Sequence, residues 1–318
     1  MAATKEKSPR EPAPCKLCGQ MRAPQLSHVI PAFVFRWQRE SSGSGYVRSS
    51  QQPNLRSQDG LKFYWLCQEC EQRFSDWERE FANRIFYPYL ERSGEVLPYG
   101  EWMLRFATSV SWRVLTYALD SEGQSIWPDE LAVKARDAEA AWRSFLLGHA
   151  AHPGDFRQLI LPMDEIAGFD ADTPANINRY LMRTIELDVP RSDRWAYTFV
   201  KMGRFIVLGQ LSDDDSSKWR AARISAREGT IEPRRFTLPL AFWNYLRGRA
   251  RKTRDTLESM SPKQHEKVDD AFRQNLSRYA DSDAFRAMKA DVDAFGADAF
   301  SRASRARASR GRESSGGE

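Results

Sequence analysis

The chain has 318 residues, of which 41% are hydrophobic and 12% aromatic, so it can bury a sizeable core and is not expected to be intrinsically disordered. Its uninterrupted apolar runs fall well short of the ~20 residues that a membrane-spanning helix needs, which argues against a membrane partner. The formal net charge is +5 at pH 7, a mild excess that permits a nucleic-acid partner without requiring one.

The start of the chain, MAATKEKSPREPAPC, is polar and charged. It has no apolar segment of the kind that a secretory signal contains, so we expect residues 1–14 to be a flexible leader. For the same reason we expect the protein to be cytoplasmic, in a compartment where thiols stay reduced.

All four cysteines belong to two close pairs, Cys15 with Cys18 and Cys67 with Cys70. In a reducing compartment this pattern is typical of a tetrahedral zinc site, because each C-x-x-C turn presents two thiolates to one ion. The usual spacing between such pairs is ~15–20 residues, whereas 48 residues separate Cys18 from Cys67, so the site needs an ordered insertion. Redox-active thiols or disulfides are the alternative.

The segments around these pairs carry clear local signals. HVIPAFVFRW predicts a strand or turn that leads into a short helix at Pro31. The Ser- and Gly-rich segment 39–54 predicts a loop or a loose hairpin connection. LKFYWLC, residues 61–67, alternates as a strand does. Apolar residues at helical spacing predict an amphipathic helix over residues 70–86. Residues 15–90 are therefore expected to form one four-cysteine module.

Residues 95–296 are expected to form a helix-rich α+β domain with a small antiparallel sheet, and its role is unassigned. Periodicity, capping residues and turn dipeptides place its elements. The expected helices span 102–118, 127–148 and 176–187, with another starting at Ser261; the expected strand pairs flank Met202-Gly203 and Glu228-Gly229.

The order of cysteine knuckle, hairpin, second knuckle and helix resembles a treble-clef zinc module. With SHVIP at Ser27–Pro31 and LCQECE at Leu66–Glu71, the first quarter of the chain resembles the HNH endonuclease family. The resemblance implies a ββα-metal site in which His28 acts as general base, activating water for attack on a phosphodiester. It also implies Mg²⁺ or Mn²⁺ beside the histidine, while the four-thiolate zinc is closed and structural.

The family pattern also points to ligands for the catalytic ion. Ser27 stands where the family commonly has an acidic residue or a histidine, and Glu71 stands where it prefers His or Asn. Asp59 is the polar residue nearest to the family's middle Asn. We expect Asp59 and Glu71 to bind the ion, since carboxylates suit hard cations; Glu78, two helical turns beyond Glu71, would join them or be solvated.

Each of these residues also has a purely structural interpretation. His28 would be a packed ring that hydrogen-bonds to the knuckle loop. Glu71 would be a carboxylate favoured by the first turn of a helix. Asp59 and Gly60 would form a simple turn.

Basic residues offer a surface for phosphate groups. The predicted nucleic-acid-binding residues are Arg247, Arg249, Arg251, Lys252 and Arg254. Residues 297–318 form an Arg-rich tail that is expected to be disordered, either as a solubilising end or as an arm that contacts phosphates.

The first functional hypothesis is therefore a metal-dependent endonuclease with His28 as its base, acting on DNA rather than RNA. The second is a non-catalytic, zinc-stabilised protein that binds nucleic acid or another protein. In a third, the zinc module only fastens the N-terminal segment to a larger domain.

Overall fold

The structure is a computed structural model that describes residues 11–42, 47–48, 53–57, 59–91, 94–122, 127–166, 168–233, 237–280 and 282–300. It mixes helices with small antiparallel sheets, as the sequence predicts. The chain divides into two compact units. The first comprises Met1–Val34, Gly60–Met163 and Ile185–Leu238, and the second comprises Phe35–Asp59, Asp164–Thr184 and Pro239–Glu318.

This division differs from the predicted boundaries at 15–90 and 95–296. Residues 35–59, expected within the four-cysteine module, belong to the second unit, and the region after residue 95 contributes to both. Helix α1 (Ala32–Glu40) begins in the first unit and ends in the second. Contacts between residues far apart in sequence decide the division, and local periodicity does not report such contacts.

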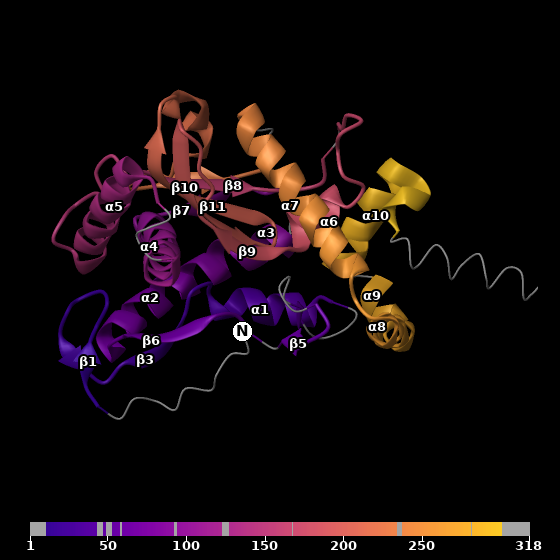
Figure 1. The fold of residues 1–318 in the computed structure, drawn as a ribbon, viewed down its shortest axis with the longest axis horizontal. Coiled ribbons are helices and arrows are strands. Elements are labelled where there is room, and N and C mark those ends of the chain that lie inside the picture. The colour runs from indigo at the N-terminus through magenta and orange to yellow at the C-terminus, as the bar shows by residue number, and fades with distance from the viewer. Residues whose placement is uncertain are drawn as a thin grey trace, which may run out of the picture. The chain divides into compact units, whose positions relative to one another are not determined.

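The first unit begins with two short antiparallel pairs. Strand β1 (Ala13–Pro14) pairs with β2 (Met21–Arg22), and β3 (Gln25–His28) pairs with β6 (Lys62–Leu66). Strand β6 leads directly into helix α2 (Gln68–Phe81). Figure 1 shows these elements in indigo and violet. The predicted strand at 61–67 and the predicted helix at 70–86 are both present.

Helix α2 continues without a break through a π-helical turn, Ala82–Phe86, into α3 (Tyr87–Glu91). Most of the apolar stripe predicted for this helix is buried. Phe81 stacks on Phe106 of helix α4 (Trp102–Glu122), with 4.1 Å between the ring centroids. Offset ring pairs of this kind add to the apolar area buried in the core. The stripe thus fixes α2 against the rest of the first unit.

Helix α4 (Trp102–Glu122) is the central element of the first unit. It contacts α2, helix α5 (Asp129–Leu147) and the four-stranded sheet, and Figure 1 shows it between α2 and that sheet. Buried side chains occur all around α4, including Phe106, Trp112 and Arg113. A helix covered on all sides is expected to be apolar throughout, so a buried arginine at this position needs a structural explanation.

The four-stranded sheet has the order β8-β11-β10-β9 with antiparallel neighbours. Strands β10 and β11 form the hairpin predicted around Met202-Gly203, and Gly203 has a φ of 59° in its turn. The left-handed conformation favours glycine at this point. The strands are β8 (Gln158–Pro162), β9 (Ile185–Asp188), β10 (Trp195–Met202) and β11 (Phe205–Asp213).

Gly209 of β11 leaves no room for a side chain. A Cβ atom there would lie 2.6 Å from Oγ1 of Thr198, and 2.7 Å from both Oγ of Ser111 and the Trp142 ring. We expect Gly209→Ala to lower the free energy of unfolding by about 1–3 kcal/mol, as overpacking does, measured by urea denaturation. Gly100→Ala is the matched control, because its Cβ would meet Trp102 at 3.6 Å. Equal stability of the two variants would contradict the prediction.

Two other predicted elements differ from the structure. The helix expected over 176–187 is α6 (Ile177–Arg183), which ends because Ile185–Asp188 pairs as β9 with β10. The hairpin expected around Glu228-Gly229 does not form. Ser216–Ala222 is a 3₁₀ helix, and β12 (Gly229–Ile231) instead pairs with β7 (Leu97–Tyr99). In both cases a distant strand supplies the backbone hydrogen bonds.

The second unit is mainly helical. Asp291 is buried and accepts hydrogen bonds from the backbone N–H groups of Asn178 and Arg179 and from the Arg179 side chain, so it joins two helices. Ser261 is the N-cap residue of α8, as predicted, with Pro262 in the first turn. The elements are the end of α1, β4 (Val47–Arg48), β5 (Arg56–Ser57), α6, α7 (Leu240–Glu258), α8 (Pro262–Gln274), α9 (Leu276–Ala280) and α10 (Asp283–Phe295).

The two chain ends fall partly outside the described residues. Most of the predicted leader 1–14 does so, although Ala13 and Pro14 form β1. Of the predicted tail 297–318, only residues 297–300 are described, and Ala299 is buried in a 3₁₀ turn, Gly296–Ala299. Across the described part of the chain, every helix is too short or too polar to span a bilayer.

Candidate metal centre and histidine site

The first cysteine pair lies on the tight turn that joins β1 to β2. The backbone N–H of Gly19 donates to the carbonyl of Cys15 (2.8 Å), and Gly19 has a φ of 73°, a conformation that glycine adopts without strain. The Lys16 N–H donates to the carbonyl of Trp65 at 2.8 Å. This bond anchors the turn to β6, the strand that precedes the second pair.

The second cysteine pair begins helix α2. Cys67 is the N-cap residue and Cys70 lies in the first turn, so both side chains sit at the end of the helix where backbone N–H groups are exposed. The N–H of Cys67 donates to Sγ of Cys15 at 3.3 Å. Hydrogen bonds of the backbone therefore hold both cysteine pairs in place.

The four sulfurs lie close enough together to bind one metal ion. All four thiols are free, and their Sγ atoms lie within 4.8 Å of one another, with Cys18 and Cys67 separated by 3.8 Å. Zinc–sulfur bonds of ~2.3 Å place the corners of a tetrahedron ~3.8 Å apart. The cluster could hold a metal ion such as zinc, and four protein ligands would leave no open position on it.

The pKa values of the cysteine thiols shift in different directions. A hydrogen bond with Cys70 lowers the pKa of Cys15 to about 4, and that same bond, together with burial, raises the pKa of Cys70. Burial raises the pKa of Cys67 to about 11. A bound cation would displace protons from these thiols, because thiolates are the metal-binding form.

His28 is the last residue of β3, and its neighbour Ser27 contacts helix α2. Ser27 is buried, and its Oγ donates to Oε2 of Glu71 at 2.5 Å. The strand that carries the predicted general base is thus joined to the helix turn that carries one predicted ion ligand. Strand pairing positions the histidine, and the first turns of α2 position the carboxylate.

Glu78 and Arg113 complete this group. An Nη1–Oε1 distance of 2.7 Å joins Arg113 to Glu78, and the same Nη1 donates to the backbone carbonyl of His28 at 2.9 Å. Burial raises the pKa of Glu78, the positive charge of Arg113 opposes this rise, and the charges of Glu71 and His28 also act on Glu78. We call His28, Glu71, Glu78 and Arg113 the His28 cluster.

Asp59 is the last residue of a segment of the second unit, so its role as an ion ligand stays a prediction. Within the first unit, the carboxylate that joins Glu71 is Glu78. The sequence offered a weak signal for Glu78, since it follows Glu71 by two helical turns, but it offered none for Arg113, which lies on another helix.

The predicted nucleic-acid-binding residues lie on α7 of the second unit, and several of them have partners within that unit. Arg247 is buried and binds Asp170 at 2.9 Å, Arg251 donates to the carbonyl of Asp172, and Arg254 pairs with Glu258 at 3.2 Å. Arg249 is half-buried over the Tyr245 ring. Lys252 is exposed, and like Arg251 it presents its charge at the surface.

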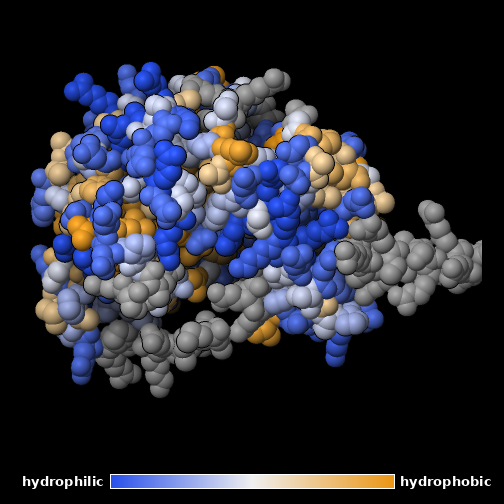
Figure 2. Space-filling view, turned by 45° about the horizontal axis from the view of Figure 1, so that its top comes forward, coloured by the Kyte–Doolittle hydropathy of each residue, from blue (hydrophilic) through white to orange (hydrophobic). Residues whose placement is uncertain are grey.

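Figure 2 shows that hydrophilic residues cover much of the face in view, while hydrophobic residues form several separate groups. This pattern agrees with the mean hydropathy of −0.63. The face therefore offers charged and hydrogen-bonding groups over most of its area.

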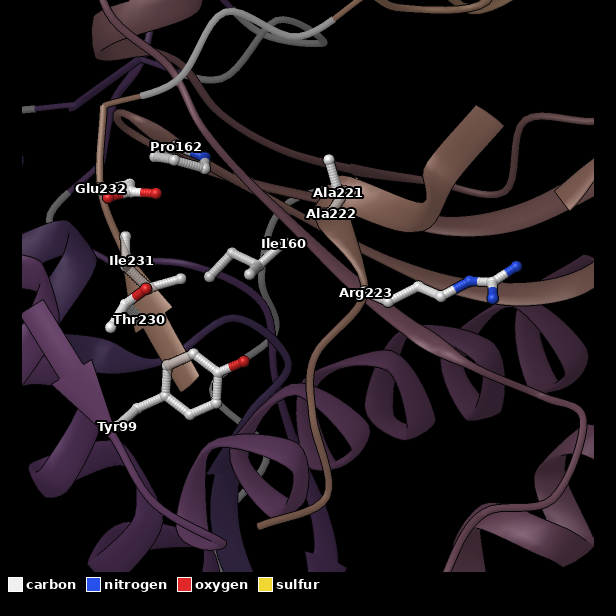
Figure 3. Close-up of a pocket in the computed structure, with 9 residues that line it drawn as sticks. All are labelled: Tyr99, Ile160, Pro162, Ala221, Ala222, Arg223, Thr230, Ile231 and Glu232. Carbon is white, nitrogen blue, oxygen red and sulfur yellow. The ribbon is translucent and has the colours of Figure 1, made fainter. Parts of the chain in front are cut away.

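A separate, small pocket, open to solvent, lies in the first unit. Figure 3 shows the Tyr99 ring on one side and the Arg223 side chain extending away from that ring. The Tyr99 hydroxyl accepts a hydrogen bond from the Ser225 N–H, and Arg223 donates to Ser216. The Tyr99 hydroxyl and one terminal nitrogen of Arg223 are thus used within the fold. None of the lining residues of the pocket belongs to the cysteine pairs or the His28 cluster.

Comparison with known proteins gives no assignment to set beside this geometry: no family model, no curated protein and no solved structure matches the chain.

Proposed function

We propose that the protein is a metal-dependent endonuclease of the HNH type, built on a treble-clef zinc module, that hydrolyses phosphodiester bonds of nucleic acid, with DNA preferred. The observation that carries this proposal is the His28 cluster: Arg113 contacts both Glu78 and the carbonyl of His28, and the charges of Glu71 and His28 act on Glu78. Glu71 follows Cys70 of the four-cysteine cluster directly. The sequence order of knuckle, paired strands, knuckle and helix supports it. In the expected reducing compartment the four thiolates would hold a structural zinc ion.

His28 would act as the general base. A neutral imidazole takes a proton from water near neutral pH. His28 is the last residue of β3, and its backbone carbonyl accepts a hydrogen bond from Arg113. Glu71 would bind a hard divalent cation through its carboxylate. The Ser27 hydroxyl holds one oxygen of that carboxylate in place. When bound, Mg²⁺ or Mn²⁺ supplies charge stabilisation at the scissile phosphate.

One observation favours the alternative, a non-catalytic zinc-stabilised protein that binds nucleic acid or protein. Both carboxylates of the His28 cluster already have internal partners, Ser27 for Glu71 and Arg113 for Glu78. A site that serves packing alone would satisfy its polar groups in the same way. The test below separates the two functions.

The test is nicking of supercoiled plasmid by the full chain, dialysed free of loosely bound metal and supplied with Mg²⁺ or Mn²⁺. We expect cleavage with the added ion, and we expect Glu71→Gln to need more ion or to lose activity, because it keeps the shape of the side chain but removes its charge. Glu69→Gln is the matched control, since Glu69 lies on the same turn of α2, is exposed and pairs with Arg22.

A wild-type chain that cleaves neither plasmid nor single-stranded RNA with either ion would refute the proposal and support the non-catalytic function. Equal loss in Glu71→Gln and Glu69→Gln would remove Glu71 from the site.

A further inference from the structure

Arg113 is a buried cation outside the N-terminal module. It lies on α4, in the region whose role the sequence left unassigned, and its side chain is only 3% exposed. Removing a guanidinium from water is costly unless opposite charge and hydrogen bonds compensate. The chain therefore places a costly group here, and its contacts indicate the reason.

Three of those contacts converge on elements of the His28 cluster. Nη1 contacts both Oε1 of Glu78 (2.7 Å) and the carbonyl oxygen of His28 (2.9 Å), and the guanidinium carbon lies 5.3 Å from the centroid of the Phe74 ring. A single nitrogen thus ties a carboxylate of α2 to the end of the strand that carries the histidine. Since a guanidinium is planar and rigid, this link also fixes orientation.

The remaining terminal nitrogen of Arg113 is also informative. Nη2 is buried and has no hydrogen-bond partner among the described residues. A structural arginine usually satisfies such donors, because a buried donor without a partner destabilises the fold. A water molecule or another oxygen ligand beside His28 and Glu78 would accept a hydrogen bond from this nitrogen.

Resting on the proposed nuclease function, we propose that Arg113 is a positioning residue of the His28 site, contributed by the helical region that follows the zinc module. It holds Glu78 in an ion pair, so that Glu71 is the carboxylate left to face the divalent ion. It also fixes the strand end from which the His28 ring projects. Helix α4 is then part of the catalytic architecture and not only of the core.

This role predicts opposite changes in ion binding and turnover. In Arg113→Met the Glu78 carboxylate loses its cation and becomes available to Mn²⁺, so the ion should bind more tightly than in the wild type. Turnover should fall by about 10–100-fold, as it does when groups that orient metal ligands are removed. Arg113→Lys, which keeps the charge but not the fork of donors, should lie between the two.

The experiment measures Mn²⁺ binding to the full chain by electron paramagnetic resonance without nucleic acid, and plasmid nicking across a Mn²⁺ titration. Arg105→Met is the matched control. Arg105 lies two turns earlier on α4, over the rings of Trp77 and Phe145, so its loss should change neither readout. Adding Glu78→Gln to Arg113→Met should return Mn²⁺ affinity toward the wild-type value.

Arg113→Met with wild-type turnover and Mn²⁺ dependence would overturn the positioning role while leaving the nuclease function intact. A wild-type chain without cleavage would instead remove the proposed function, and the positioning role with it. Should Arg113→Met fail to fold, as judged by circular dichroism and zinc content, Arg113→Lys decides the question by the same comparison.

Discussion

Replacement of Cys67 by serine is expected to abolish zinc binding and to unfold the N-terminal part of the first unit. Structural zinc contributes about 10–16 kcal/mol of apparent binding free energy in small zinc peptides, which is as large as the whole stability of a typical domain. Cys67 directly follows β6 and is the N-cap residue of α2, and its sulfur lies 3.8 Å from that of Cys18. Its loss therefore affects the ion and two elements at once.

The measurement is zinc per chain by atomic absorption after dialysis, followed by thermal denaturation with circular dichroism. We expect about one zinc ion in the wild type, none in Cys67→Ser and a clearly lower melting temperature. Lys16→Ala is the control, because Lys16 lies between Cys15 and Cys18 but contributes only an exposed pair with Asp120. A wild-type chain without zinc, or a serine variant that retains it, would contradict the metal assignment.

Replacement of His28 by alanine is expected to lower the rate of nucleic-acid cleavage by about 10²–10⁴-fold, the range that general-base catalysis contributes. The substitution removes the ring but not the carbonyl that accepts from Arg113, so the strand end should stay in place. Single-turnover nicking with saturating Mn²⁺ measures the chemical step, and the melting temperature reports on the fold.

His149→Ala, prepared in the same way, is the control for loss of a histidine and for contaminating nucleases. His149 is exposed just after α5 in the same unit, and its variant should cleave as the wild type does. Equal rates for His28→Ala and the wild type would exclude His28 as the base, whatever the zinc content.

Local sequence signals located most helices of the first unit. The stripe of Phe74, Trp77 and Phe81 predicted the helix that α2 forms, and Gly148 ends α5 in the left-handed conformation, as its position after the helix implied. Both signals depend on residues within a few turns of one another.

The sequence was less informative where distant strands compete for backbone hydrogen bonds. Ile185 continued a helical spacing from Ile177, yet it pairs with Met202 in the sheet. Gly229 stood in an apparent hairpin turn, yet it pairs with Tyr99 of β7. Pairing partners more than ten residues away outweigh local preference, and the sequence does not name them.

The candidate site divides in the same manner. By itself, the sequence determined the two cysteine pairs, because ligand type and the short spacing within each pair are local properties. It also indicated His28 and Glu71 through their positions next to those pairs. Only the tertiary structure brought the four sulfurs within 4.8 Å, across the long insertion, and only it placed Arg113 of α4 against Glu78 and the carbonyl of His28. A buried charge is stabilised by whichever groups the packed core brings near it. The order of those groups along the chain does not predict which of them will be in contact.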